Sequence, residues 1–258
     1  MSLLRSAQPR RPFVAGLGVL ALISLIFLLA PWIDIGVSSL FYDPASGFLH
    51  ERRPALQVVR EAGRIVEWLF ALSVLLPLAI KLLAPDAPLL VRPRTTLFVL
   101  GSLALGPGLL VNGILKEFWG RARPRELLDF GGESTFSRVW SISDQCQDNC
   151  SFVSGEAAGA FWLVALAFIV PRAWRWVASA ATIAFAAIIS FTRIAMGGHF
   201  LSDVLIAWML VLLVILLLHR LTLQTLPPGF DEAVERALEA PMRVLRRRFA
   251  LRRHRPPL

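Results

Sequence analysis

Residues Phe191 to Leu205 read FTRIAMGGHFLSDVL and place an arginine, a histidine and an aspartate at the edge of a long apolar block. Charged side chains are costly inside a membrane and usually mark a functional site there. The block itself, Phe200 to Leu218, is almost wholly apolar and has about the length that a membrane-spanning helix needs. The stretch therefore predicts a helical membrane protein with a polar site at one end of its helices.

The rest of the chain has the same membrane character. Of its 258 residues 56% are hydrophobic, and the mean hydropathy is +0.62. The apolar residues form six blocks close to the roughly 20 residues that cross a bilayer. These blocks are Phe13 to Ala30, Ile65 to Leu83, Thr96 to Leu115, Gly155 to Val170, Trp174 to Ser190 and Phe200 to Leu218. We predict an all-α membrane bundle of six transmembrane helices in residues 1–220, followed by a basic cytoplasmic tail in residues 221–258.

The net charge of +9 would indicate a nucleic-acid partner in a soluble protein, but its distribution indicates a membrane topology. Six spans place both termini on one side, and most arginines fall on that side. They precede the first block, lie between blocks 2 and 3 and between blocks 4 and 5, and end in the run RVLRRRFALRRHR. We therefore expect a bacterial inner-membrane protein with cytoplasmic termini, long loops 31–64 and 116–154 on the periplasmic side, and no nucleic-acid partner.

The tail has apolar residues at helical spacing among its arginines, including Val234 and Leu238, although Pro241 interrupts any helix there. We expect an amphipathic stretch that lies on anionic lipid, with a disordered basic tail as the alternative. Cys146 and Cys150, in DQCQDNCSF, lack the further ligands of a zinc site. On the oxidising side of the membrane we expect a local disulfide, and free thiols are the alternative.

Polar residues also gather at the outer ends of the third and fourth blocks. The third block ends in LKEFWGRARP, which places Lys116, Arg121 and Arg123 just beyond the span. Charges that merely end a span are the alternative to an anion site, but they are commoner on the cytoplasmic side. The fourth block begins with Ser154 and Gly155, which offer a hydroxyl, backbone N–H groups and the positive end of a helix dipole. An ordinary N-cap is the alternative there.

The third polar group is the opening stretch itself, where His199 and Asp203 share one helical face. An aspartate that accepts from one imidazole nitrogen leaves the other free as a nucleophile, although such a pair also caps helices. All three groups fall on the same predicted side of the membrane. Several cations, a helix N-terminus and a histidine nucleophile in one place are typical of a phosphoryl-transfer site.

These residues resemble the motifs of the type 2 phosphatidic acid phosphatase (PAP2) superfamily. Lys116 through Arg123 and Pro124 match its K-x6-R-P motif, and Arg193, His199 and Asp203 match its R-x5-H-x3-D motif. The resemblance covers roughly residues 65–218 and implies a membrane phosphatase that works through a phosphohistidine without a metal or another cofactor. It implies that His199 is the nucleophile and Asp203 its orienting partner. The phosphate ligands that it implies are Lys116, Arg123, Ser154, Gly155 and Arg193, and it leaves the role of Arg121 open.

The second motif departs from the family pattern P-S-G-H, because this chain has Val153 to Glu156. The family histidine protonates the leaving oxygen, whereas a free glutamate has a pKa of about 4.3. Desolvation and a bound phosphate raise a carboxyl pKa, and about 6–7 suits a general acid, so we predict that role for Glu156. The alternatives are that Glu156 only stabilises the start of its helix, or that His50 in the other outer loop replaces it.

The combination of GRARP, FGG, C-x3-C and CSFVSGEA is similar to the lipid A 4′-phosphatase branch of the superfamily. The expected function is hydrolysis of a phosphate from a phosphorylated or pyrophosphorylated lipid, with lipid A-type substrates favoured, at the periplasmic face. The alternatives are an undecaprenyl pyrophosphate or phosphatidylglycerol phosphate phosphatase, and a non-catalytic lipid-binding or transport homologue. Vanadate haloperoxidases have a similar site but are soluble, so the six apolar blocks argue against them. The sequence indicates no particular oligomeric state.

Overall fold

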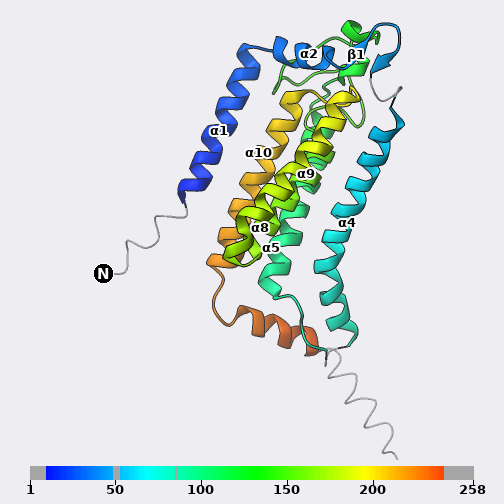
Figure 1. Cartoon of the computed structure of the whole chain (residues 1–258). Helices are drawn as coiled ribbons and strands as arrows, with labels where there is room; N and C mark the ends of the chain where they lie inside the picture. Colours follow the sequence, from blue (N-terminus) through cyan, green and yellow to red (C-terminus); the bar gives the residue numbers. More distant parts are fainter. Residues whose placement is uncertain (1–9, 49–52, 85–86, 241–258) are drawn as a thin grey trace, which may run out of the picture.

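Within residues 10–48, 53–84 and 87–240, the part of the chain that the structure describes, five helices are long and apolar enough to cross a membrane. In the computed structural model they run side by side along one direction (Figure 1). They are Arg11–Leu29, Pro54–Leu83, Pro93–Phe118, Arg172–Ala195 and Leu201–Gln224. The prediction of a helical membrane bundle is therefore confirmed.

The expected fourth span is shorter than the other spans. It is made of α7 (Gly155–Trp162), η5 (Leu163–Ala165) and α8 (Leu166–Ile169), together 15 residues. At 1.5 Å per residue this segment is about 22 Å long, less than the roughly 30 Å of hydrocarbon. Six spans are thus not established by helix length, although the six expected segments all form helix.

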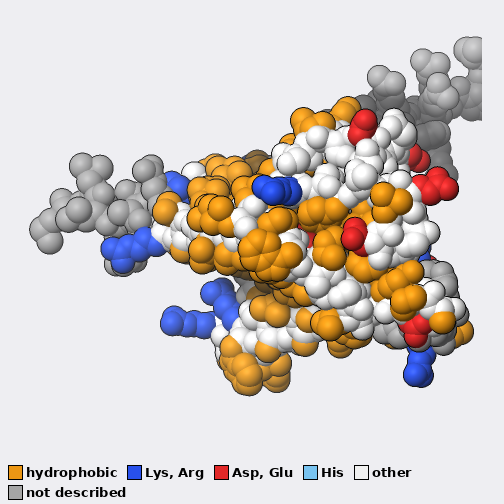
Figure 2. All heavy atoms as spheres, turned by 90° about the horizontal axis from the view of Figure 1, so that it is seen from above, with side chains coloured by type: hydrophobic (Ala, Val, Ile, Leu, Met, Phe, Trp, Pro, Cys, Tyr) orange, Lys and Arg blue, Asp and Glu red, His pale blue; other side chains and the backbone are white. Residues whose placement is uncertain are grey.

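The α7–α8 segment lies at the centre of the bundle. Helix α7 packs against α4 (Pro54–Leu83), η2 (Ala104–Leu115), α9 (Arg175–Ala195) and α10 (Leu201–Leu218). Its small residues Ala157 to Ala160 are buried, and small side chains let neighbouring helices approach closely. Helix α1 (Arg10–Leu29) packs mainly on α10 at the periphery. Seen from above (Figure 2), hydrophobic side chains cover much of the flanks of the molecule.

The third span changes its helical geometry before it reaches the site. Helix α5 (Pro93–Leu103) continues into η2, a π-type segment that contains Pro107, and then into α6 (Lys116–Phe118). Proline has no N–H to donate and disturbs the regular helical ladder. The Asn112 side-chain amide donates to the Pro107 carbonyl over 2.7 Å, so this carbonyl has a hydrogen-bond partner within the same segment. The helix then ends at Lys116 to Phe118, where the predicted cation group begins.

The site end of the bundle, at the top of Figure 1, is covered by short elements that the sequence did not predict. They are α2 (Trp32–Ser39), β1 (Tyr42–Asp43), β2 (Gly47–Phe48), η3 (Pro124–Glu126) and η4 (Leu128–Phe130). The antiparallel pair β1–β2 and η4 contribute Phe48 and Phe130 to a small buried cluster with Phe200. A disulfide joins Cys146 to Cys150 within the loop before α7.

At the opposite end, α10 continues through η7 (His219–Gln224), and residues 230–240 form a helix that folds back on the bundle. Lys81 is only 3% exposed and pairs with Glu235 and Glu239 at 2.9 and 2.8 Å. Phe230 and Val234 line an apolar cavity against α5, so this first part of the predicted lipid-facing stretch contacts protein. Pro241 and the arginine run after it lie outside the described residues.

Candidate active site

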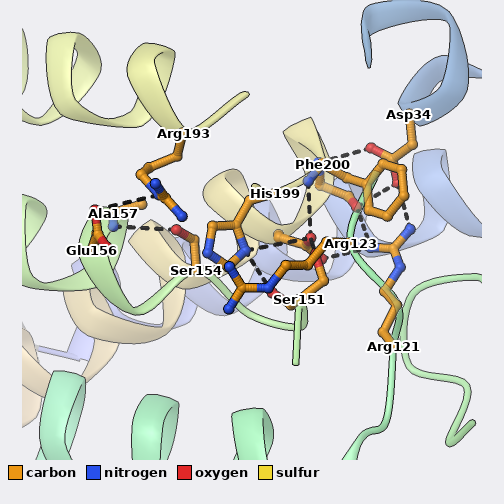
Figure 3. A network of polar contacts seen from close by, with 12 residues as sticks. Asp34, Arg121, Arg123, Ser151, Ser154, Glu156, Ala157, Arg193, His199 and Phe200 are labelled. Atoms are coloured by element: carbon orange, nitrogen blue, oxygen red, sulfur yellow. Dashed lines mark hydrogen bonds and ion pairs between the residues drawn. The ribbon is translucent and has the colours of Figure 1, made fainter. Parts of the chain in front are cut away.

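His199 lies at the centre of the polar network in Figure 3 and is 1% exposed. It stands between α9 and α10, and its Nδ1 is 2.8 Å from the main-chain carbonyl of Ser151. A carbonyl oxygen only accepts, so Nδ1 carries the proton and Nε2 keeps its lone pair. The orienting partner was expected to be Asp203, but its Oδ2 is 3.9 Å from Nδ1. The contact that holds the ring is therefore the Ser151 carbonyl.

The surroundings of His199 keep its ring neutral. Burial lowers the pKa of His199 well below its ordinary value of 6.5, and the charges of Arg193, Arg123 and Lys116 lower it further. These are the three cations of the two motifs, so the fold does gather them around the histidine. A neutral imidazole with a free nitrogen is the form that acts as a nucleophile.

Asp203 acts on His199 through Ser151. Its carboxylate accepts from the Ser151 hydroxyl at 2.6 Å and from the Phe200 N–H at 3.0 Å, which fixes the first turn of α10. Ser151 thus bonds to Asp203 through its side chain and to His199 through its backbone. The predicted pair is present on one face, but a serine lies between its members.

Arg121, whose role the sequence left open, is a buried tie between three parts of the chain. It is 0% exposed and donates to Asp203 at 2.6 Å and to Asp34 on α2 at 2.9 Å. Its guanidinium carbon also lies 4.2 Å from the centre of the Phe200 ring. Asp34 in turn accepts from the Ser202 N–H at 2.9 Å, on the first turn of α10. Sequence reasoning missed Asp34, although an aspartate inside WIDIGV was a signal.

The phosphate ligands implied by the motifs lie near His199. Arg193, at the end of α9, is 3% exposed, and its Nη2 would lie 2.6 Å from a Cβ at position 198, so Gly198 makes room for it. Arg123 is 7% exposed and donates through Nη2 to the Asn149 carbonyl. Lys116, at the start of α6, shares the lining of one cavity with Gly155.

Ser154 is the N-cap of α7, which is the alternative to an anion site that the sequence left open for it. Its hydroxyl accepts from the Ala157 N–H at 3.3 Å, and its own N–H donates to the Asp203 carbonyl at 3.2 Å. The positive end of the α7 dipole therefore faces the same region as the cations. Cap and anion site are compatible, because the hydroxyl keeps its hydrogen for another acceptor.

The surroundings of Glu156 argue against the predicted general acid. Arg60 on α4 donates to both carboxylate oxygens over 2.6–2.9 Å, and Arg193 Nε lies 3.3 Å from Oε2. Two guanidinium groups favour the ionised carboxylate, which has no proton to give. Sequence analysis missed Arg60 because α4 begins at Pro54, well before the expected start at Ile65. The other candidate acid, His50, lies outside the described residues.

Within the described ranges, no group of three or more His, Cys, Asp or Glu side chains is placed to hold a metal ion. The site offers a histidine with a lowered pKa, the motif cations Arg123 and Arg193 and the N-terminus of α7 in one buried region (Figure 3), and the charge of Lys116 also acts on the histidine. Such an arrangement suits a ligand with several anionic oxygens around an electrophilic centre.

Comparison with known proteins agrees with this chemistry. A family model described as the PAP2 superfamily matches residues 95–226. A lipid A 4′-phosphatase of Francisella tularensis subsp. novicida is 33% identical over 193 residues, which are 74% of this chain and 86% of the relative. Proteins of the same name from Rhizobium leguminosarum and Rhizobium etli are 43% and 44% identical over 131 residues, 51% of this chain. These matches span 56% and 51%, about half, of the Rhizobium proteins.

A solved structure shares the fold. The structure described as the first transmembrane PAP2 type phosphatidylglycerolphosphate phosphatase, from Bacillus subtilis, superposes with a TM-score of 0.52. The two chains are 18% identical, and the superposition covers 84% of this chain and 98% of the other. At this identity the likeness shows a common arrangement of helices.

The Arg121 tie predicts a large loss of stability when its charge is removed. Arg121→Gln leaves Asp34 and Asp203 buried without their cation, so we expect the free energy of unfolding to fall by about 3–5 kcal/mol. Equilibrium unfolding in detergent measures this fall. The control is Arg125→Gln, an exposed arginine four residues away, and equal effects of the two changes would contradict the role given to Arg121.

Proposed function

The chain belongs to the PAP2 superfamily, and we propose that it is a membrane-bound lipid phosphatase that removes a phosphate from a lipid A-type substrate through His199. The observation that carries the proposal is the buried His199 ring, which Ser151 holds at Nδ1; burial and the charges of Arg193, Arg123 and Lys116 lower its pKa. Its multiple apolar helices make it a multi-pass membrane protein. Relatives named lipid A 4′-phosphatase support the choice of substrate.

The proposed reaction has two steps. Nε2 of His199 attacks the phosphorus, an N–P bond forms, and the bond from phosphorus to the lipid oxygen breaks. The motif cations and the N-terminus of α7 stabilise the charge on the three equatorial oxygens. The positive charge that develops on the imidazole is stabilised by the hydrogen bond from Nδ1 to the Ser151 carbonyl. Asp203 holds Ser151 in place. Water then attacks the phosphohistidine, releases inorganic phosphate and restores the neutral ring.

For Glu156 we propose a positioning role. Its carboxylate holds Arg60 and Arg193 together at the start of α7, so that both guanidinium groups face the phosphate region. Arg60 then provides positive charge beside the leaving oxygen, which compensates for the absence of the family histidine. The leaving oxygen is stabilised electrostatically in this scheme and takes its proton from water.

The membrane arrangement is also part of the proposal. We place α7–α8 across the membrane as a sixth span, because its surroundings are other helices and its short length is no obstacle inside a bundle. The site end then faces the periplasm of a bacterial inner membrane, with both termini in the cytoplasm. Basic residues at the other end, among them Lys81, Arg94 and Arg175, support this orientation. Residues 1–220 form the phosphatase domain and residues 221–258 the tail.

Two alternatives to a lipid A-type phosphatase are a phosphatase for another lipid and a non-catalytic homologue. Undecaprenyl pyrophosphate or phosphatidylglycerol phosphate would meet the same cations, and a non-catalytic homologue would bind a phosphorylated lipid without turnover. The oriented, neutral His199 favours an enzyme, because a pure binder gains little from a free imidazole nitrogen.

The direct test is phosphate release by the detergent-purified full chain, with EDTA and without added metal. We expect faster release from lipid A than from undecaprenyl pyrophosphate, phosphatidylglycerol phosphate or phosphatidic acid. His199→Ala should lower kcat by about 10³-fold or more while the protein keeps its thermal stability. Release that does not depend on His199 would contradict the mechanism, and binding without release would support the non-catalytic alternative.

A second test separates the two roles of Glu156. A general acid contributes about 10²–10⁴-fold, mainly for poor leaving groups. If Glu156 only positions Arg60 and Arg193, then Glu156→Gln should lower kcat/KM by a similar factor for the lipid and for an activated aryl phosphate. The exposed Glu133→Gln serves as the control. A loss confined to the lipid would restore Glu156 as the proton donor.

A further inference from the structure

A cavity opens directly beside the proposed phosphate site. Its volume is about 400 Å³, and its lining includes Lys116, Gly155 and Glu156, which also belong to that site. The other side of the cavity is formed by α4. Volumes of this size are typical of pockets for small organic groups. A group attached to a phosphate at His199 would therefore have this space next to it.

Helix α4 turns one charged face toward the cavity. Arg60, Arg64 and Glu67 all line it, and their spacing of four and three residues places them along one side of a helix. Ionisable residues within a membrane-spanning helix face a cavity or the bundle interior because lipid cannot solvate them. Arg60 is engaged by Glu156 and Arg64 by Glu61. Of these three residues, Glu67 lies farthest from the start of α4.

Glu67 has a shielded oxygen with no hydrogen-bond partner in the described part of the chain. Its other oxygen would lie 2.3 Å from a Cβ at position 159, so Gly159 on α7 is what admits the carboxyl. A shielded polar atom without a partner is unfavourable and is a feature that calls for an explanation. Glu67 lines the cavity, so a ligand hydroxyl there would supply the missing hydrogen bond once the side chain turns its shielded oxygen toward the cavity.

Apart from Asn112, whose side-chain amide donates to the Pro107 carbonyl, the remaining walls of the cavity are apolar or aromatic. The Trp162 indole N–H already donates to Ser102 Oγ at 3.0 Å, so this residue offers the cavity only apolar ring surface. Trp68 on α4 contributes a second aromatic wall. A sugar ring has apolar C–H faces and hydroxyl edges, and it matches such a combination of aromatic walls and a carboxyl acceptor.

We propose that this cavity holds the sugar group that carries the scissile phosphate, and that Glu67 selects it by hydrogen bonding to one of its hydroxyls. The inference rests on the proposed function and adds to it a residue that discriminates between head groups. Glu67 is a specificity-determining residue in this account, since it contacts the substrate away from the reacting atoms. Lipid phosphates without a free hydroxyl near the phosphate would leave the carboxyl without its partner.

The test compares two substrates and three variants in the full-length protein in detergent. The substrates are lipid A, with sugar hydroxyls, and phosphatidic acid, whose glycerol hydroxyls are esterified. Glu67→Leu removes the acceptor, Glu67→Gln keeps a hydrogen-bonding side chain, and Glu133→Leu changes an exposed glutamate that does not line the cavity. We expect Glu67→Leu to lower the ratio of kcat/KM for lipid A over phosphatidic acid by about tenfold or more. Glu67→Gln should keep most of that ratio, and Glu133→Leu should leave it unchanged.

An unchanged ratio in Glu67→Leu, or an equal loss for both substrates, would overturn the proposal. The binding of both lipids is also measured in a His199→Ala background, where turnover does not interfere. If the unmodified protein releases no phosphate, the proposed function fails, yet the binding ratio still decides whether Glu67 recognises the sugar. Weaker binding of lipid A alone in the Glu67→Leu protein supports the inference in that case too.

Discussion

The buried ion pairs of Arg121 with Asp34 and Asp203 are the constraint on which the site depends. One arginine in the loop after α6 is held by an aspartate from α2 and an aspartate from α10, and all three side chains are almost fully buried. Buried charges are tolerated only when they are paired and hydrogen-bonded with good geometry. The pairing therefore fixes the loop and α2 relative to the first turn of α10, next to His199.

The geometry of His199 follows from this arrangement. Asp203, held by Arg121, accepts from the Ser151 hydroxyl, and Ser151 in turn presents its carbonyl to Nδ1 of the histidine. The proton stays on Nδ1 and the lone pair on Nε2 points away from this scaffold. The motif cations Arg193, Arg123 and Lys116 lie outside this chain of hydrogen bonds, and their charges lower the pKa of the His199 ring. The result is a buried imidazole with a lowered pKa and an unprotonated Nε2, the form that the proposed nucleophile requires.

The sequence alone predicted the helical segments, and the motif residues that it singled out lie at one end of the bundle, for physical reasons. Membrane spans are long apolar blocks, and His199, Asp203 and Arg193 lie within one short stretch with fixed spacing. The role of Ser151 had no signature, because a backbone carbonyl is common to every residue. Arg60 was missed since α4 starts before its apolar block does, and the expected acid role of Glu156 depended on that unseen partner. Asp34 and α2 needed the folded chain, because their contacts join residues far apart in sequence.

In the proposed mechanism, Glu156 in place of the family histidine changes how the leaving group is handled, while His199 keeps the role of nucleophile. That mechanism depends on covalent catalysis by His199. Its most direct measurement is a rapid alkaline quench after mixing the protein with ³²P-labelled lipid substrate, followed by peptide mapping. We predict an alkali-stable, acid-labile label on the peptide that contains His199, formed and lost at rates that support turnover. Turnover without any labelled protein, or a label on another residue, would contradict it.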